Sequence, residues 1–376
     1  MPAHDETVRL GRPMIDIDDI QAVAAVLATG DLVQGRVVEA LERKLSGFLG
    51  DVEVVAVSSG TAALHLALKS VGVGPGDEVV VPAFTFPATA NVVEWLGARP
   101  VFCDIAPGSF NAGPREVLRV LSRRTRAVMP VHAFGEPADV RGIAHAIRGA
   151  GRGKQPAIIE DAACALGAER GGQAAGTIGD AGCFSFHPRK IMTTGEGGLV
   201  ITRRAPLARR IRALRSHGLV RGSRGFDLVE PGLNYRMTDF QAALGLAQLS
   251  RLGTLIAQRA ALAEAYREAL DGLPGLTLPP IPLEGVGVAQ SFVVTFRSRR
   301  LRARAEAALG KHGIETTFGT HCVPLLGWYR RRYGHERRDF PNAVAARERT
   351  LSLPLHPSLT AKDQARVIRC LEEALL

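Results

Sequence analysis

Asp180-Ala-Gly-Cys-Phe-Ser-Phe-His-Pro-Arg-Lys190 and its continuation Ile191-Met-Thr-Thr-Gly-Glu-Gly-Gly198 decide how this chain folds and which chemistry it can carry. The stretch begins with an apolar run, 181–186, whose length is typical of a buried strand. Pro188 ends strand pairing because it has no N–H to donate, and Lys190 follows in a loop of small and hydroxyl-bearing residues. A lysine on a tight loop between buried strands is partly desolvated, and its amine can condense with an aldehyde. A lone lysine in a loop more often points into water, so its surroundings must decide.

The strand at 181–185 is one of a series in which apolar strands alternate with helical stretches. Strands are predicted at 54–57, 78–81, 100–103, 127–131, 157–160, 181–185 and 199–202. Such alternation is typical of an α/β fold with a mostly parallel sheet covered by helices on both faces. Ligands of these sheets gather at the carboxyl ends of the strands, and Gly60, Asp161 and Lys190 each lie at or just past a strand end. We therefore expect these residues along one edge of the sheet.

The length of 376 residues favours two unequal domains. A strongly helical stretch at 240–270 is predicted to bridge them. Beyond it, a strand at 291–296 and helices at 301–312 and 361–376 would form a smaller α+β domain. We expect a large domain over 1–250, N-terminal helices included, and a small C-terminal domain over 251–376.

Three surface segments complete this outline. The basic, glycine-rich stretch 149–156 is predicted to be an exposed loop, and 218–232 to be irregular. The arginines of a helix at 203–215 are expected to form a solvated face. The glycines of 30–35 either end a helix at 16–29 or, as the family resemblance given below implies, border a substrate pocket.

Composition disfavours several classes of function. The formal net charge is +10, yet only 5% of residues are aromatic and no basic block is interleaved with aromatics, so nucleic-acid binding is not expected. No apolar stretch is long enough to span a membrane, and the first residues lack the hydrophobic block of a secretory signal. The five cysteines are scattered without metal-ligand spacing, which indicates reduced thiols, a cytoplasmic location and no metal site.

Two further strands end in groups that could share a ligand with Lys190. The strand at 157–160 runs into the carboxylate of Asp161, for which a helix N-cap is the alternative interpretation. The strand at 54–57 leads through Gly60 and Thr61 into a helix, whose free N–H groups and dipole can bind a phosphate. Ser185 adds a hydroxyl. An amine, a carboxylate and a phosphate cradle are what pyridoxal phosphate (PLP) requires.

Six motifs occur in one order along the chain. They are Ser58-Ser-Gly-Thr-Ala-Ala-Leu-His65, Gly76-Asp-Glu-Val-Val-Val-Pro82, Glu160-Asp-Ala-Ala163, Ser185-Phe-His-Pro-Arg-Lys190, Thr193-Thr-Gly-Glu-Gly-Gly198 and Asn234-Tyr-Arg-Met-Thr-Asp239. Together they resemble the DegT/StrS-type sugar aminotransferases, which are fold type I enzymes that use PLP. The likeness runs from Arg12 to the end of the chain.

The resemblance implies a role for each candidate residue. Lys190 would be the Schiff-base lysine and proton carrier, and Asp161 would keep the pyridine nitrogen of the cofactor protonated. Phe86 would stack on the cofactor ring, its alternative being an ordinary core position. Asn234 would reach the cofactor phosphate of a neighbouring subunit, which implies a homodimer with shared active sites.

Two positions bear on the place of this chain within the family. Cys164 stands three residues after Asp161, where a glutamine or histidine near the phenolic oxygen of the ring is common; a thiol is a weaker donor. Relatives that remove a sugar hydroxyl carry histidine where this chain has Lys190. Lysine at this position favours amino transfer.

The implied reaction transfers an amino group, with glutamate as the expected donor, to a keto-sugar carried on a nucleotide. PLP alternates with pyridoxamine phosphate (PMP) in such a reaction, and an excess of arginine suits a diphosphate carrier. The alternatives are an aminocyclitol-forming transaminase that acts on a free keto-cyclitol, a non-catalytic PLP-binding regulator, and a lyase or desulfurase on the same fold.

Overall fold

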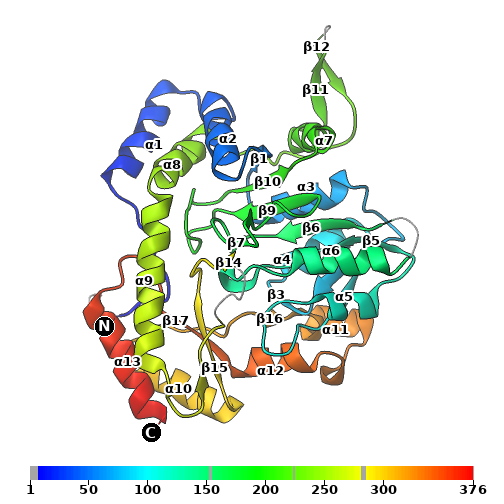
Figure 1. Cartoon of the computed structure of the whole chain (residues 1–376). Helices are drawn as coiled ribbons and strands as arrows, with labels where there is room; N and C mark the ends of the chain where they lie inside the picture. The colour runs from blue at the N-terminus through cyan, green and yellow to red at the C-terminus, as the bar shows by residue number, and fades with distance from the viewer. Residues whose placement is uncertain (1–6, 152–154, 223–224, 281–284, 376) are drawn as a thin grey trace.

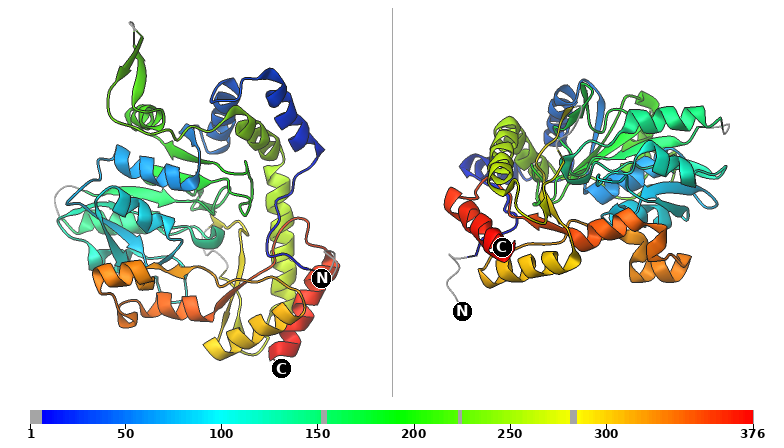
Figure 2. Two further views of the ribbon diagram at one scale, coloured as in Figure 1. Left: turned by 180° about the vertical axis from the view of Figure 1, so that it is seen from behind. Right: turned by 60° about the horizontal axis from the view of Figure 1, so that its bottom comes forward.

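The computed structural model describes residues 7–151, 155–222, 225–280 and 285–375. A layered α/β body occupies one side of the molecule, and the long helix α9 (Leu252–Leu270) runs along it towards the C-terminal helices (Figure 1). A two-stranded hairpin projects from the body at the opposite end (Figure 1). Figure 2 shows the same projection from behind.

The body is built on a seven-stranded sheet of order β1-β10-β9-β6-β5-β2-β4. Its strands are β1 (Glu53–Val57), β2 (Glu78–Pro82), β4 (Arg99–Cys103), β5 (Thr125–Val128), β6 (Ala157–Asp161), β9 (Ala181–Ser185) and β10 (Gly198–Thr202). Only β10 runs against its neighbours; the other adjacent pairs are parallel. The seven predicted strands and the mostly parallel sheet are confirmed, with β5 ending three residues earlier than expected.

Helices cover both faces because alternate side chains of each buried strand point to opposite sides. Val55 and Val57 belong to one hydrophobic cluster with α3 (Gly60–Ser70), whereas Val54 and Ala56 belong to another with α2 (Arg36–Phe48). The remaining helices of this part are α1 (Ile17–Thr29), α4 (Ala88–Trp95), α5 (Pro114–Val120), α6 (Val140–Gly149), α7 (Ala205–Arg215) and α8 (Asp239–Ser250). Short elements complete it: β3 (Phe84–Thr85), η1 (Ala133–Gly135), β7 (Glu169–Arg170) and β8 (Gln173–Ala174).

The C-terminal part has its own hydrophobic cluster, which includes Tyr266, Phe292 and Leu371. Its elements are β13 (Leu276–Thr277), β14 (Gly285–Val286), β15 (Phe292–Phe296), α10 (Arg299–Lys311), β16 (His321–Cys322), η2 (Val323–Leu325), α11 (Gly327–Tyr333), η3 (Arg337–Asp339), α12 (Pro341–Arg349), β17 (Thr350–Leu353) and α13 (Ala361–Leu375). Strand β16 pairs with β3, and α11 and α12 contribute to the cluster of the α/β body. The division of the chain at residue 250 remains a prediction.

Three local predictions were wrong. The segment 218–232 is not irregular, because β11 (Leu219–Gly222) and β12 (Gly225–Leu228) form an antiparallel hairpin. The helix expected over 240–270 is two helices, since the backbone leaves the helical region at Arg251. Not all arginines of α7 face water: Arg215 is 4% exposed and lies 2.6 Å from the carboxylate of Glu42. Part of the loop expected at 149–156 lies outside the described residues.

Candidate active site

The candidate residues meet at the carboxyl edge of the central sheet. Because β10 is antiparallel to β9, the loop between them closes at this edge without a crossover helix, and it carries Lys190. Asp161 ends β6, the neighbour of β9, and Gly60 opens α3 directly after β1. The predicted placement along one edge is confirmed for these three residues.

The N-terminus of α3 is shaped for close approach to β9. Ser59 caps the helix, its hydroxyl accepting the N–H of Ala62 at 3.1 Å. A Cβ added at Gly60 would lie 2.8 Å from the Cβ of Ser185, so only glycine permits this contact. Thr61 is exposed in the first turn. The hydroxyl of Ser185 therefore lies against the first turn of α3, and a helix N-terminus is suited to a phosphate.

The loop that carries Lys190 is folded around Phe186. The carbonyl of Phe186 accepts the hydroxyl of Thr193 at 2.9 Å and the N–H of Thr194 at 3.0 Å. The N–H of Lys190 donates to the carbonyl of His187 at 2.8 Å. Its side-chain amine lies 3.0 Å from the Sγ of Cys164. The amine therefore points towards the segment that follows Asp161.

Asp161 is 6% exposed, and two donors reach its carboxylate within the described part of the chain. The hydroxyl of Thr89 donates to Oδ2 at 2.8 Å, and the N–H of Ala163 donates to Oδ1 at 3.2 Å. Burial raises the pKa of Asp161, and the bonds from Thr89 and Ala163 and the charge of Lys190 oppose that rise. A carboxylate can accept about four hydrogen bonds, so Asp161 has capacity for another donor.

Two threonines behind Asp161 were not found from the sequence. The hydroxyl of Thr89 gives its proton to Asp161, so it must accept from Thr85, which lies 2.9 Å away. Both side chains are buried, with exposures of 2% for Thr85 and 0% for Thr89. Two hydroxyls four residues apart, one in β3 and one in the first turn of α4, were the available signal.

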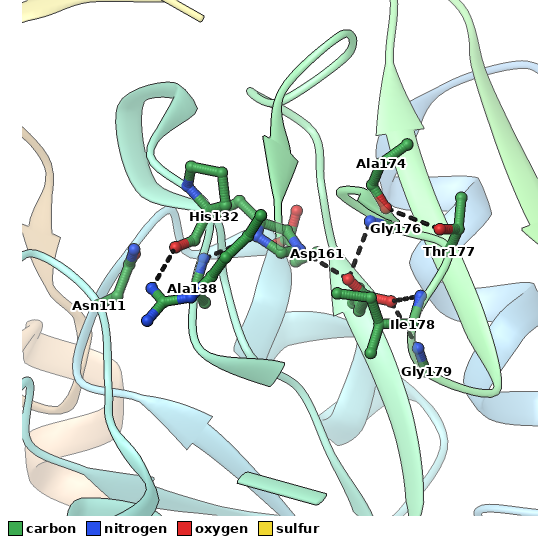
Figure 3. Close-up of polar contacts among 12 residues, drawn as sticks. Asn111, His132, Ala138, Asp161, Ala174, Gly176, Thr177, Ile178 and Gly179 are labelled. Carbon is green, nitrogen blue, oxygen red and sulfur yellow. Dashed lines mark hydrogen bonds and ion pairs between the residues drawn. The ribbon is translucent and has the colours of Figure 1, made fainter. Parts of the chain in front are cut away.

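On its other side β6 carries Glu160, which pairs with His132 from the segment after β5; both side chains are 0% exposed. Figure 3 shows His132 and the neighbouring residues of this network. The N–H of Ala138 donates to His132 Nδ1 at 3.0 Å, so the proton of the neutral ring is on Nε2, which donates to Glu160 at 3.0 Å. The other donors to Glu160 are the N–H groups of Gly176, Ile178 and Gly179, at 2.8, 2.7 and 2.6 Å. The N–H of His132 also donates to the carbonyl of Asp161 at 3.0 Å. This network supports the strand that presents Asp161.

Two of the predicted site residues, Phe86 and Asn234, are exposed on the surface. Phe86 is 65% exposed, so its alternative interpretation as a core residue is wrong; its ring meets His321 edge-on, with centroids 6.4 Å apart. Asn234 is exposed, and its Oδ1 accepts the N–H of Arg236 at 3.3 Å. The next residue, Tyr235, accepts the N–H of Ser58 at 2.9 Å. Asn234 therefore lies one residue from the backbone that contacts the strand leading to Gly60.

The profile of the DegT/DnrJ/EryC1/StrS aminotransferase family matches residues 13–372. The chain belongs to this family. This aminotransferase is 36% identical over 374 residues to the spore coat polysaccharide biosynthesis protein SpsC of Bacillus subtilis (strain 168), with 96% of this chain and 95% of SpsC covered.

Solved structures of the family superimpose on nearly the whole chain. The aminotransferase TlmJ from Streptoalloteichus hindustanus is 35% identical, with a TM-score of 0.91 and coverage of 98% of this chain and 99% of TlmJ. Spr1654 from Streptococcus pneumoniae, a candidate sugar aminotransferase solved in its PLP-form, is 29% identical, with a TM-score of 0.93 and coverage of 98% of both chains. Spr1654 is also known in its PMP-form. These findings confirm the predicted family, fold class, aminotransferase activity and PLP cofactor.

Proposed function

We propose that this aminotransferase moves an amino group from an amino acid, glutamate being the expected donor, to the keto group of a sugar carried on a nucleotide. The observation that carries the proposal is the amine of Lys190, held 3.0 Å from Cys164 in the segment that begins with the buried carboxylate of Asp161. The relative SpsC acts in polysaccharide biosynthesis by its name, which supports a sugar as the acceptor.

The residues at the sheet edge fit the cofactor. When bound, PLP supplies an electron sink that stabilises negative charge on the amino-bearing carbon of the substrate. Gly60, Thr61 and Ser185 would hold its phosphate through backbone N–H groups and hydroxyls beside the α3 N-terminus. Asp161 would take a ring N–H with its spare acceptor capacity. The exposed ring of Phe86 is free to stack on it.

Lys190 would act twice in this site. Its Nζ would first hold the cofactor through the aldehyde carbon. When it is not bound to the cofactor, Nζ would hold and move the proton that leaves the amino-bearing carbon of the amino acid. Cys164 Sγ, 3.0 Å away, offers the released amine a hydrogen-bond partner in the place where a glutamine or histidine is common in the family.

A cluster beside Phe86 supports an anionic substrate. The ring of His321 meets both Phe86 and Phe318, and the guanidinium of Arg347 lies over the ring of Phe318 at 3.6 Å. Arg189 is exposed next to Lys190. Guanidinium groups bind phosphate oxygens with two parallel hydrogen bonds, which suits a nucleoside diphosphate.

Two exposed apolar groups support a homodimer with shared sites. One spans 14–33, where the buried residue of α1 is Asp19 and several large apolar side chains are exposed. The other spans 219–233 and ends beside Asn234. Their members are Met14, Ile15, Ile17, Ile20, Leu27, Leu32, Val33, Leu219, Phe226, Leu228, Val229 and Leu233. Exposed apolar patches of this extent mark protein interfaces. A second copy that covers them would bring Asn234 to the neighbouring site.

The cytoplasmic location is part of the same proposal. The five cysteines are free thiols, as expected of a reducing compartment. No helix among the described residues is long and apolar enough to cross a bilayer. Cell fractionation of the producing organism tests the location.

Incubation of the purified holoenzyme with glutamate tests the activity. The absorption band of the PLP form is expected to convert to that of the PMP form, and a panel of ketones then reverses the conversion. A nucleotide-linked keto-sugar should react faster than a free keto-cyclitol; the opposite order would favour the aminocyclitol alternative. Absence of any conversion would favour a non-catalytic regulator, and release of pyruvate or alanine without a keto acceptor would indicate a lyase or desulfurase.

Sedimentation and subunit mixing test the dimer. The protein is expected to sediment as a dimer. Lys190→Ala and Asn234→Ala chains, mixed and refolded together, should regain part of the activity, because one of the two sites in a mixed dimer receives both native residues. A monomer with full activity would contradict the shared site.

A further inference from the structure

The segment 288–290 joins the C-terminal part of the molecule to the α/β body. The N–H of Val288 donates to the carbonyl of Gly135 at 3.1 Å. A Cβ added at Gly135 would lie 1.9 Å from the carbonyl oxygen of Val288, so the close packing requires glycine, which also has a φ of +94°. The segment is therefore fixed on one side by the body.

On its other side the segment is held by Arg259 of α9, which is 4% exposed. The Nε of Arg259 donates to the carbonyl of Ala289 at 2.9 Å, and its Nη2 donates to the carbonyl of Gln290 at 2.7 Å. Burial lowers the pKa of Arg259 to about 10, so the side chain stays charged at neutral pH. A buried charge is unfavourable unless it is hydrogen-bonded, and these two carbonyls supply its partners.

The side chain of Gln290 reaches from this fixed segment to the loop that carries Lys190. Gln290 is 6% exposed, and its Nε2 donates to the carbonyl of Arg189 at 2.6 Å. That carbonyl belongs to the same peptide group as the backbone nitrogen of Lys190, whose N–H donates to the carbonyl of His187 at 2.8 Å. Both ends of the peptide group that precedes the Lys190 side chain are thus held.

We propose that Gln290 is a positioning residue for Lys190, itself fixed by Arg259 and Gly135; the inference rests on the proposed role of Lys190. A peptide group held at both ends restricts the directions in which the Lys190 side chain leaves the backbone. Without Gln290 the carbonyl of Arg189 loses the donor that it has in the described part of the chain, and the loop can rotate about this peptide. The amine then spends less time in the position from which it holds the cofactor.

The test compares Gln290→Leu with a matched control, Gln364→Leu. Gln364 is also 6% exposed, and its Nε2 donates to a backbone carbonyl, that of Leu262, at 2.7 Å. Both substitutions remove one buried amide-to-carbonyl bond, so both should lower the thermal midpoint to a similar extent. Only Gln290→Leu should act on the site.

The readouts are the dissociation rate of PLP from the holoenzyme and the pH midpoint of its visible absorption band. For Gln290→Leu we expect PLP to dissociate at least about fivefold faster, the effect of one lost hydrogen bond, and the pH midpoint to shift. For Gln364→Leu we expect a change of less than about twofold. Equal rates in both variants and wild type would overturn the positioning role. If Gln290→Leu does not fold, Gln290→Asn, which keeps the amide but is one methylene too short, gives the same comparison.

Borohydride reduction of the wild-type holoenzyme separates this outcome from a failure of the proposed function. Mass spectrometry should find the cofactor attached to Lys190. If the label is absent from Lys190, the proposed function fails; if Lys190 is labelled but PLP release is unchanged in both Gln290 variants, only the role of Gln290 fails.

Discussion

Glu160 and Asp161 are consecutive residues of β6, and their side chains enter two regions that differ in how completely their polar groups are paired. In the part of the chain that the structure describes, Glu160 accepts from four N–H groups, one of them on His132, and the side chains of Glu160 and His132 are fully buried. Asp161 accepts from two donors in the described part of the chain, and Lys190 beside it contacts a thiol. Saturated hydrogen bonding stabilises a fold, whereas spare capacity is what a bound cofactor can use.

The comparison predicts opposite outcomes for substitutions on the two sides of the strand. Substitutions on the Asp161 side should lower the rate of the reaction and leave the fold intact. Changes on the Glu160 side should reduce stability and leave the chemistry of the surviving folded molecules largely intact. Four substitutions test this separation.

Lys190→Ala should have the largest effect on chemistry. Without the amine, no group is placed to carry the proton, and the rate of cofactor conversion with glutamate should fall by about 10⁴-fold or more. The thermal midpoint of the cofactor-free protein should stay close to that of wild type, because the side chain donates to a weakly accepting thiol. Stopped-flow absorbance and calorimetry measure the two quantities. Full activity in this variant would refute the proposed role of Lys190.

Asp161→Asn should lower the same rate by about 10²- to 10³-fold, because the cofactor ring loses its anionic partner. The stability of the folded chain, by contrast, should rise at neutral pH. Burial raises the folded-state pKa of Asp161, so the folded chain binds a proton more readily than the unfolded chain. The contribution of Asp161 to stability therefore falls as the pH rises from the pKa of its unfolded state to the pKa of its folded state. Asparagine does not titrate, so the stability of the variant lacks this decrease.

Thermal unfolding of the cofactor-free proteins at several pH values checks the sign. At neutral pH Asp161→Asn should have the higher midpoint, and the difference should shrink as the pH falls towards the unfolded pKa. A variant that is less stable at neutral pH would mean that the two donors to Asp161 outweigh its burial, and the contrast with Glu160 would be lost.

Glu160→Gln should lower the free energy of unfolding by about 3 kcal/mol. An amide can accept with one oxygen only, so its NH₂ would face either the N–H groups of Ile178 and Gly179 or those of Gly176 and His132. His132 cannot adapt by moving its proton, since Nδ1 already accepts the N–H of Ala138. Urea denaturation measures the loss. A stability equal to that of wild type would show that Glu160 is not the anchor of this region.

The seven strands and the strand-end positions of Gly60, Asp161 and Lys190 could be predicted because apolar runs and loop residues are local features. The supporting contacts could not. Gln290 reaches a carbonyl 101 residues away, and Thr85 acts on Asp161 through Thr89, relations that appear only once the chain has folded. The ion pair between Arg215 and Glu42 likewise joins elements that no sequence period connects. The hairpin at 219–228 was missed because its side chains are largely exposed and give no burial pattern.

Of the four substitutions, Cys164→Ala should have the smallest effect on the rate of cofactor conversion. It tests how far the site tolerates a Lys190 amine that has lost its contact with Sγ. The variant removes the Sγ that lies 3.0 Å from the Lys190 amine, and a thiol is a weak hydrogen-bond partner. The rate of cofactor conversion should change by no more than about threefold, and the thermal midpoint should hardly move, since Cys164 is only half-buried. Steady-state kinetics at several pH values would show whether the pH profile of the rate moves as well. A loss of activity as large as that of Asp161→Asn would mean that the thiol is needed for the reaction itself. The Asp161 side of β6 would then have less spare hydrogen-bonding capacity than the two donors to Asp161 indicate.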